Sequence, residues 1–116
     1  MTSQGTAYGR FQRALRNGQV FQAELAAREL GGLTLADALR LTILYADAEP
    51  EKFSRAAARW HARLVADAGL DLLEAQLALS ALLLLAGSER NRATDLLIRL
   101  GRRHAINLTA FNRPTQ

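Results

Sequence analysis

The stretch Leu33-Thr34-Leu35-Ala36-Asp37-Ala38 returns 37 positions later as Leu70-Asp71-Leu72-Leu73-Glu74-Ala75. Each copy opens an apolar segment that ends at a short break and is followed by an arginine-rich amphipathic segment. A fixed period of this size is typical of stacked helical hairpins. We therefore expect residues 33–105 to form two consecutive helical hairpins.

The composition favours helices throughout the chain. Hydrophobic residues make up 49% of the 116 residues, aromatic residues only 6%, and there are just two prolines, Pro50 and Pro114. Leucine and alanine dominate, and both are better helix formers than strand formers. We predict an all-α fold of five to six helices, arranged as about three antiparallel αα-hairpins in a helical-repeat-like array or an orthogonal bundle. We expect one domain over residues 7–105, with flexible tails at 1–6 and 106–116.

Turn and capping residues place the ends of the helices. Thr34 with Asp37 and Asp71 with Glu74 have the spacing of helix N-caps with an acid three residues on, and Ser88 is predicted to cap the last helix. A proline in the first turn loses no hydrogen bond, so Pro50 is well placed to begin a helix. The expected helices cover approximately residues 7–16, 19–30, 34–46, 50–69, 71–87 and 88–105.

Hydrophobic periodicity predicts how these helices pack. The helices of residues 34–46 and 71–87 are apolar nearly all round, which predicts a central buried pair. The other two helices of the repeat are apolar on one side and should cover that pair. Their apolar lines are Phe53, Ala57, Trp60 and Leu64, and Ala93, Leu97, Leu100 and His104, the second widened by Leu96.

The pattern over residues 33–105 resembles the helical hairpins of tetratricopeptide and HEAT-type repeats in its period and amphipathicity. The tetratricopeptide signature of Trp, Leu-Gly, Tyr, Ala, Phe and Pro at set spacings is absent, so the resemblance is one of architecture. It implies a protein-binding scaffold.

Signals of catalysis are nearly absent from the sequence. The chain has no cysteine and no glycine-rich phosphate loop. His61 and His104 lack a second ligand at the spacing of a helical metal site, and we interpret both as packed or surface residues. Asp37 and Glu74 are expected to cap helices rather than act as a catalytic pair. We therefore predict a protein that is not an enzyme and has no cofactor and no metal.

Targeting signals are also absent. The first residues do not form a signal peptide, and the apolar run from Leu72 to Ala86 is shorter than the roughly 20 residues of a membrane span. We expect a cytoplasmic protein that does not cross a membrane.

The basic residues outnumber the acidic ones and give a net charge of +4. Helical spacing places eight of them in two rows, one on the helix of residues 50–69 and one on the helix of residues 88–105. If the repeat places these two helices in equivalent positions, the rows would form one surface for an anionic partner. The first row is Lys52, Arg55, Arg59 and Arg63, and the second is Arg92, Arg99, Arg102 and Arg103. A solvated arginine-rich surface without a partner is the competing interpretation. A helix-turn-helix over residues 20–44 is disfavoured, because Asp37 and Arg40 would occupy apolar positions of that motif.

A second apolar surface is predicted on the helix of residues 19–30. Val20, Phe21 and Leu25 would leave enough apolar area there for a homodimer. The sequence thus favours a non-catalytic helical interaction or scaffold module that binds another protein or itself. The alternative is a small basic nucleic-acid-binding or regulatory protein that uses its arginine-rich helix faces.

Overall fold

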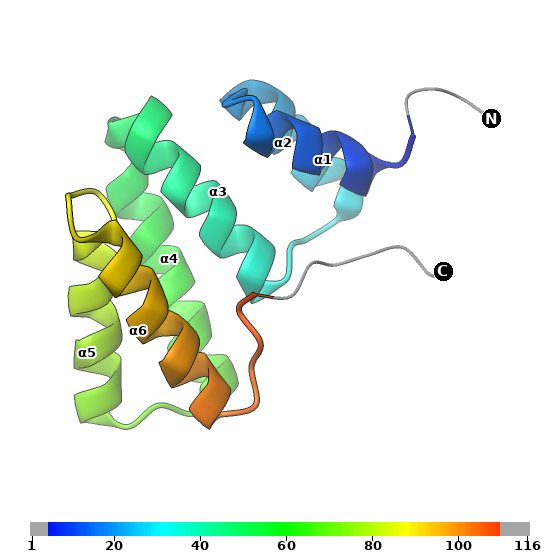
Figure 1. Cartoon of the computed structure of the whole chain (residues 1–116). Helices are drawn as coiled ribbons and strands as arrows, with labels where there is room; N and C mark the ends of the chain where they lie inside the picture. Colours follow the sequence, from blue (N-terminus) through cyan, green and yellow to red (C-terminus); the bar gives the residue numbers. More distant parts are fainter. Residues whose placement is uncertain (1–4, 110–116) are drawn as a thin grey trace.

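The computed structural model describes residues 5–109, and within this range the chain forms six α-helices and no strand (Figure 1). The all-α fold expected from composition is confirmed. The expectations for residues 1–4 and 110–116 lie outside the described residues. The helices are α1 (Ala7–Arg16), α2 (Val20–Leu30), α3 (Leu35–Ala48), α4 (Pro50–Ala68), α5 (Leu72–Leu84) and α6 (Arg90–Arg103).

Local capping explains where the two apolar helices begin. The Thr34 side chain accepts a hydrogen bond from the backbone N–H of Asp37 at 3.1 Å, at the start of α3. At the start of α5, Asp71 accepts from the Glu74 N–H at 2.8 Å, and Glu74 accepts from the Asp71 N–H at 3.2 Å. Both predicted caps are confirmed, and the second is a complete capping box.

The predicted cap at Ser88 is wrong. Helix α6 begins at Arg90, and Glu89 occupies the N-cap position without a side-chain capping bond. The Arg90 guanidinium instead donates to the carbonyl of Leu85 at 2.7 Å and pairs with Asp47 of α3 at 2.6 Å. A tertiary ion pair therefore sets the start of this helix.

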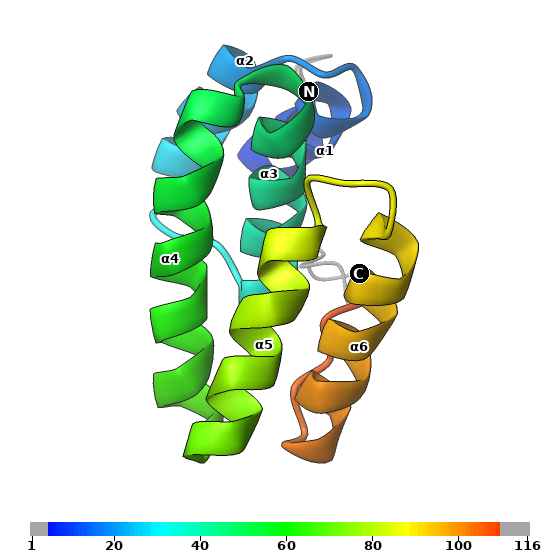
Figure 2. The same cartoon turned by 90° about the vertical axis from the view of Figure 1, so that its left-hand side faces the viewer.

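Consecutive helices pack as three hairpins, α1 with α2, α3 with α4 and α5 with α6. The second and third hairpins join through contacts between α4 and α5, while α1 and α2 both contact α3. In Figure 1 the first hairpin lies against α3 at one end of the molecule, and α5 lies at the other end. Figure 2 shows α5 between α4 and α6.

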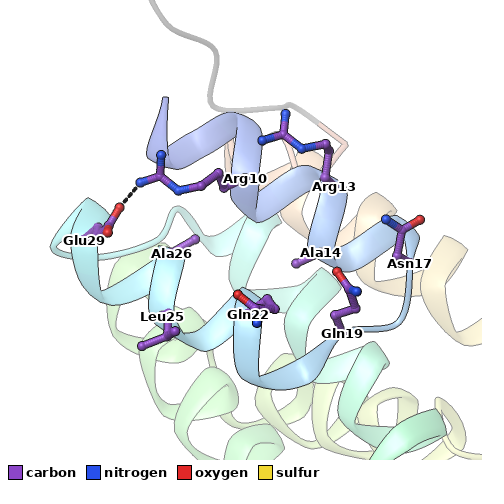
Figure 3. A pocket seen from close by; sticks show the side chains of 9 residues that line it. All are labelled: Arg10, Arg13, Ala14, Asn17, Gln19, Gln22, Leu25, Ala26 and Glu29. Atoms are coloured by element: carbon purple, nitrogen blue, oxygen red, sulfur yellow. Dashed lines mark hydrogen bonds and ion pairs between the residues drawn. The ribbon is translucent and has the colours of Figure 1, made fainter. Parts of the chain in front are cut away.

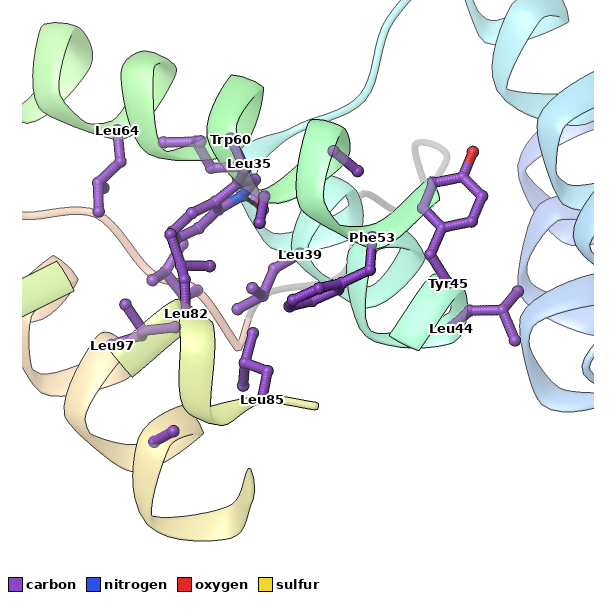
Figure 4. Packing of buried hydrophobic residues seen from close by; sticks show 14 of the residues in the cluster. Leu35, Leu39, Leu44, Tyr45, Phe53, Trp60, Leu64, Leu82, Leu85 and Leu97 are labelled. Carbon is purple, nitrogen blue, oxygen red and sulfur yellow. Dashed lines mark hydrogen bonds between the residues drawn. The ribbon is translucent and has the colours of Figure 1, made fainter. Parts of the chain in front are cut away.

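The core cluster runs through all three hairpins, and Figure 4 shows its part around the second and third hairpins. As predicted, Phe53, Ala57, Trp60 and Leu64 of α4 are buried, and so are Leu35 and Leu39 of α3. The Trp60 indole N–H donates to the carbonyl of Leu35 at 2.8 Å, so the one polar atom of this large side chain is satisfied in the core. Leu82, Leu85 and Leu97 close the core from α5 and α6.

The expectation that α5 is buried all round is wrong. Six of its leucines are exposed, from 42% for Leu79 to 85% for Leu72. Leu96 of α6 is 41% exposed, so it does not widen the buried line of that helix. Helix α3 does have the predicted central position, since Leu35, Leu39 and Tyr45 are all buried.

Packing extends beyond residue 105, where the sequence placed the end of the domain. The Ile106 N–H donates to the carbonyl of Gly101 at 2.8 Å, and the Leu108 side chain is buried in the core. Arg40 of α3 donates to the carbonyl of Thr109 at 3.3 Å. Residues 106–109 therefore form a C-terminal arm that returns from α6 to α3.

Candidate interaction surfaces

Among residues 5–109, the largest group of exposed leucines lies on α5. We call it the α5 leucine surface, and it comprises Leu72, Leu73, Leu77, Leu79, Leu83 and Leu84. At about 100° per residue these side chains fall within one half of the helix circumference, with Gln76 and Ser80 among them. The opposite half carries the buried residues Ala78, Ala81 and Leu82. The helix thus has one apolar side in the core and a second apolar side facing solvent.

The size of this surface sets it apart from scattered exposed leucines. Given the exposed fractions of its six members, it amounts to on the order of 600 Å² of apolar area, at the upper end of the largest patches on monomeric proteins. No charged residue occurs between Glu74 and Glu89 in the sequence. Patches of this size mark interaction sites.

Polar contacts hold α5 in place from both neighbouring helices. His61 of α4 lies 2.7 Å from the carbonyl of Ala75. His104 of α6 lies 3.0 Å from a Glu74 carboxylate oxygen, and Arg103 lies 3.7 Å from the same oxygen. The hydrogen bond with His104 is the main cause that lowers the pKa of Glu74, supported by the backbone N–H of Asp71. These contacts fix the first turns of α5, so the leucine surface is presented by a well-anchored helix.

The predicted basic residues lie on the two helices that flank α5. All eight are exposed, but α4 and α6 lie on either side of α5 rather than against each other (Figure 2). The two rows are therefore not joined into one ridge. Within each row, half of the charges are engaged by carboxylates: Lys52 by Glu24 and Glu49, Arg63 by Asp67, Arg92 by Glu89 and Arg103 by Glu74.

Lys52 belongs to a polar cluster between α2, α3 and α4. The Tyr45 hydroxyl donates to Glu24 at 2.6 Å, and the Lys52 ammonium lies 3.1 Å from the same carboxylate oxygen. Burial, followed by the bond to Glu24, raises the pKa of Tyr45 to about 12. The bond from Tyr45 is in turn the main cause that lowers the pKa of Glu24. This cluster uses the Lys52 charge to attach α2 to the second hairpin.

Among the hollows that lie next to arginine side chains, two lie within the first and second hairpins. One, of about 450 Å³, lies between α1 and α2 (Figure 3), where Arg10 forms an ion pair with Glu29 across the opening. The other, of about 280 Å³, lies between α3 and α4, with Trp60 and Leu41 in its wall beside Arg59 and Arg63. Both are small and open.

The self-association surface predicted on α2 is only partly available. Val20 is buried, with 6% exposure, because its side chain belongs to the core between the helices of the first hairpin. This part of the prediction is wrong. Phe21 is 62% exposed and Leu25 is 37% exposed, and they remain a small apolar area on α2.

The two carboxylates at equivalent repeat positions have different surroundings. Glu74 is bonded within its capping box and to His104. Asp37 is buried, accepts from the Tyr8 hydroxyl at 3.2 Å and pairs with Arg40 at 2.8 Å. Asp37 thus links α1 to α3.

Among residues 5–109, no group of three or more histidine, cysteine or acidic side chains is arranged to hold a metal ion. No helix in the same range has the length and apolar character needed to cross a membrane.

Comparison of the chain with protein-family models, with curated proteins and with solved structures found no match. The α5 leucine surface is the one that sequence reasoning missed. Gln76 and Ser80 interrupt this otherwise apolar helix, but two neutral polar residues do not distinguish an exposed helix from a buried one.

Proposed function

We propose that this protein is a non-catalytic helical interaction module that binds another protein through the α5 leucine surface. The observation that carries the proposal is the exposure of six leucines on one side of an anchored helix. Removing apolar area from water stabilises a complex in proportion to the area buried, and this patch is the largest exposed group of apolar side chains within residues 5–109. The absence of cysteine fits a module that works in the reducing cytoplasm.

The anchoring of α5 supports the proposal. A surface that is already ordered loses little conformational entropy on binding, so more of the burial energy appears as affinity. The capping box and the contacts of Glu74 and Ala75 with α4 and α6 provide that order.

Site-specific photo-crosslinking in the native cells tests this function directly. A photoreactive residue in place of Gln76 lies among the leucines, and the same residue in place of Ala62 lies on the exposed side of α4. We expect protein adducts from position 76 well above those from position 62, and mass spectrometry identifies them as copies of this chain or as another protein. Equal yields from the two positions would refute the proposal.

A nucleic-acid-binding function is the second candidate, and one observation favours it. Arg55, Arg59, Arg99 and Arg102 are exposed and make no ion pair within residues 5–109. Phosphate contacts by such residues would give an affinity that falls steeply with salt. The test is fluorescence anisotropy of duplex and single-stranded DNA over a salt series, with a variant that reverses Arg55 and Arg59. The absence of binding even at low salt would exclude this function, and binding that is unchanged by salt and by the charge reversal would exclude a role for these arginines.

A further inference from the structure

We infer that the partner of the α5 leucine surface is a second copy of the same chain, packed so that the two α5 helices are antiparallel. The inference rests on the proposed function and names its partner. It is carried by the area of the surface, by the symmetry of its sequence and by its charges.

The exposed area suits a dimer. Stable interfaces bury about 800 Å² on each partner. The six leucines alone supply on the order of 600 Å² of this area. Gln76 and Ser80 among them, and Leu96 on the adjacent α6, are also exposed and add to it. One face of one helix with its neighbour therefore provides nearly the whole area of a standard interface.

The sequence of α5 reads almost the same in both directions about Ala78. Leu72-Leu73 at one end matches Leu83-Leu84 at the other, Gln76 matches Ser80 and Leu77 matches Leu79. A twofold interface uses the same patch on both copies, so the patch must complement itself. With a twofold axis near Ala78, antiparallel helices place the leucines at one end of α5 against those at the other end of its partner. The same axis places Gln76 close to Ser80 of the partner.

Charge and helix dipoles select the antiparallel arrangement. Asp71 and Glu74 lie at the first turn of α5, and no charged residue follows in that helix. A parallel pair would bring the acidic ends and the helix dipoles of the two copies together, which is unfavourable. An antiparallel pair places these ends roughly 20 Å apart, the length of a 13-residue helix. The central contact then contains only apolar and neutral polar side chains.

Sedimentation equilibrium over a range of protein concentrations tests the choice of partner. We expect the wild type to dimerise and the double variant Leu73→Glu with Leu83→Glu to be monomeric. Both leucines are exposed, so the variant should keep its helical circular dichroism, and its urea midpoint should match the midpoint that the wild type approaches on dilution. The matched control is Phe21→Glu, which places the same charge on the exposed apolar area of α2 and should leave the dimer intact. A monomeric wild type, or a dimer that survives the double substitution, overturns the inference.

Disulfide trapping tests the antiparallel geometry, because the natural chain has no cysteine. In the proposed dimer, position 73 of one copy lies beside position 83 of the other, while the two copies of position 73 are about 15 Å apart along the helix. A disulfide requires Cα atoms within about 7 Å. A mixture of Leu73→Cys and Leu83→Cys chains should therefore crosslink, and each variant alone should not. Efficient crosslinking of Leu73→Cys with itself would overturn the antiparallel arrangement.

The two proposals fail separately. If the wild type is monomeric but position 76 photo-crosslinks to a different protein, the second copy is excluded and the interaction module stands. If neither measurement detects a partner, both proposals are refuted.

Discussion

Gly101 lies where α6 meets the C-terminal arm, and we expect its replacement by alanine to destabilise the protein. A Cβ atom at this position would lie 2.9 Å from the backbone oxygen of Ile106 and 3.1 Å from two side-chain carbons of Leu108. The first distance is shorter than real Cβ contacts, and the oxygen belongs to the backbone, so the arm itself must move. Leu108 is buried and would move with it.

Two opposing effects determine the magnitude. Alanine is a better helix former than glycine by about 1 kcal/mol in a helix interior. Against this, overpacking a core costs typically 1–3 kcal/mol, and complete exposure of a buried leucine costs about 1.5–3 kcal/mol. Because the clash displaces Leu108 rather than merely crowding it, we expect a net loss of about 1–2 kcal/mol in the free energy of unfolding.

Urea denaturation monitored by circular dichroism measures this effect. The control is Gly9→Ala in α1, where the nearest side-chain atoms lie 3.4 Å and 3.7 Å from the added Cβ and no strain arises. Gly9→Ala should raise the midpoint slightly, and Gly101→Ala should lower it. The double-mutant cycle with Leu108→Ala should be non-additive, because the arm is already displaced in Gly101→Ala. A midpoint that rises in Gly101→Ala as it does in Gly9→Ala would refute this account of the arm.

Three further changes have expected outcomes. Leu97→Ala removes a side chain with no solvent exposure and should cost about 2–5 kcal/mol by urea denaturation, and an unchanged midpoint would contradict the packing of α6. Ala105→Gly should stabilise the protein by about 1 kcal/mol, because Ala105 has a φ of 61°, where an L side chain is strained and glycine is not. A urea midpoint below that of the wild type would argue against strain at this residue. Because His104 lowers the pKa of Glu74 below its ordinary value of 4.5, this pair stabilises the fold above that pH and the contribution disappears as pH falls through the lowered pKa. Urea midpoints at a series of pH values should therefore fall more in acid for the wild type than for Glu74→Gln, and parallel pH profiles would exclude this role.

The features that could be predicted from the sequence are those with local causes. Thr34 and Asp71 cap their helices because a short polar side chain reaches a backbone N–H three residues ahead, whatever the rest of the chain does. The apolar line of α4 was correct for a similar reason, since only one side of that helix can be buried. The predicted cap at Ser88 was wrong because Arg90 makes its ion pair with Asp47, 43 residues away in the sequence. No local pattern carries that information.

The α5 leucine surface could not be predicted because burial requires neighbours as well as apolar side chains. Periodicity showed that α5 is apolar on almost every side, and the natural expectation was a helix surrounded by others. Helices α4 and α6 cover its inner side, around Ala78 and Leu82, and leave Leu72 and Leu83 facing solvent. A helix that is buried within one chain and a helix that is buried between two chains have the same sequence pattern.

The two ends of the helical array explain why the exposed leucines are on α5. Stacked hairpins bury the faces between neighbours, and the two terminal hairpins need polar outer sides to stay soluble. The first hairpin provides such an end beyond α3, where Arg10, Gln19 and Glu29 border its open hollow (Figure 3). At the opposite end, the outer side of α5 has six leucines and no charge. In the proposed interaction a partner covers that end.

The salt dependence of affinity distinguishes the proposed dimer from nucleic-acid binding. The positive charge of this chain opposes the first and favours the second. Two copies with a net charge of +4 each repel one another, and the repulsion is screened as the Debye length falls from about 10 Å at 0.1 M salt to about 3 Å at 1 M. A dimer held by leucines should therefore tighten as salt increases. Nucleic-acid binding by Arg55 and Arg59 should weaken over the same range, because each counterion released into a more concentrated salt solution gains less entropy. In the proposed dimer the basic helices α4 and α6 border the leucine surface, and we expect their arginines to limit its affinity at low salt.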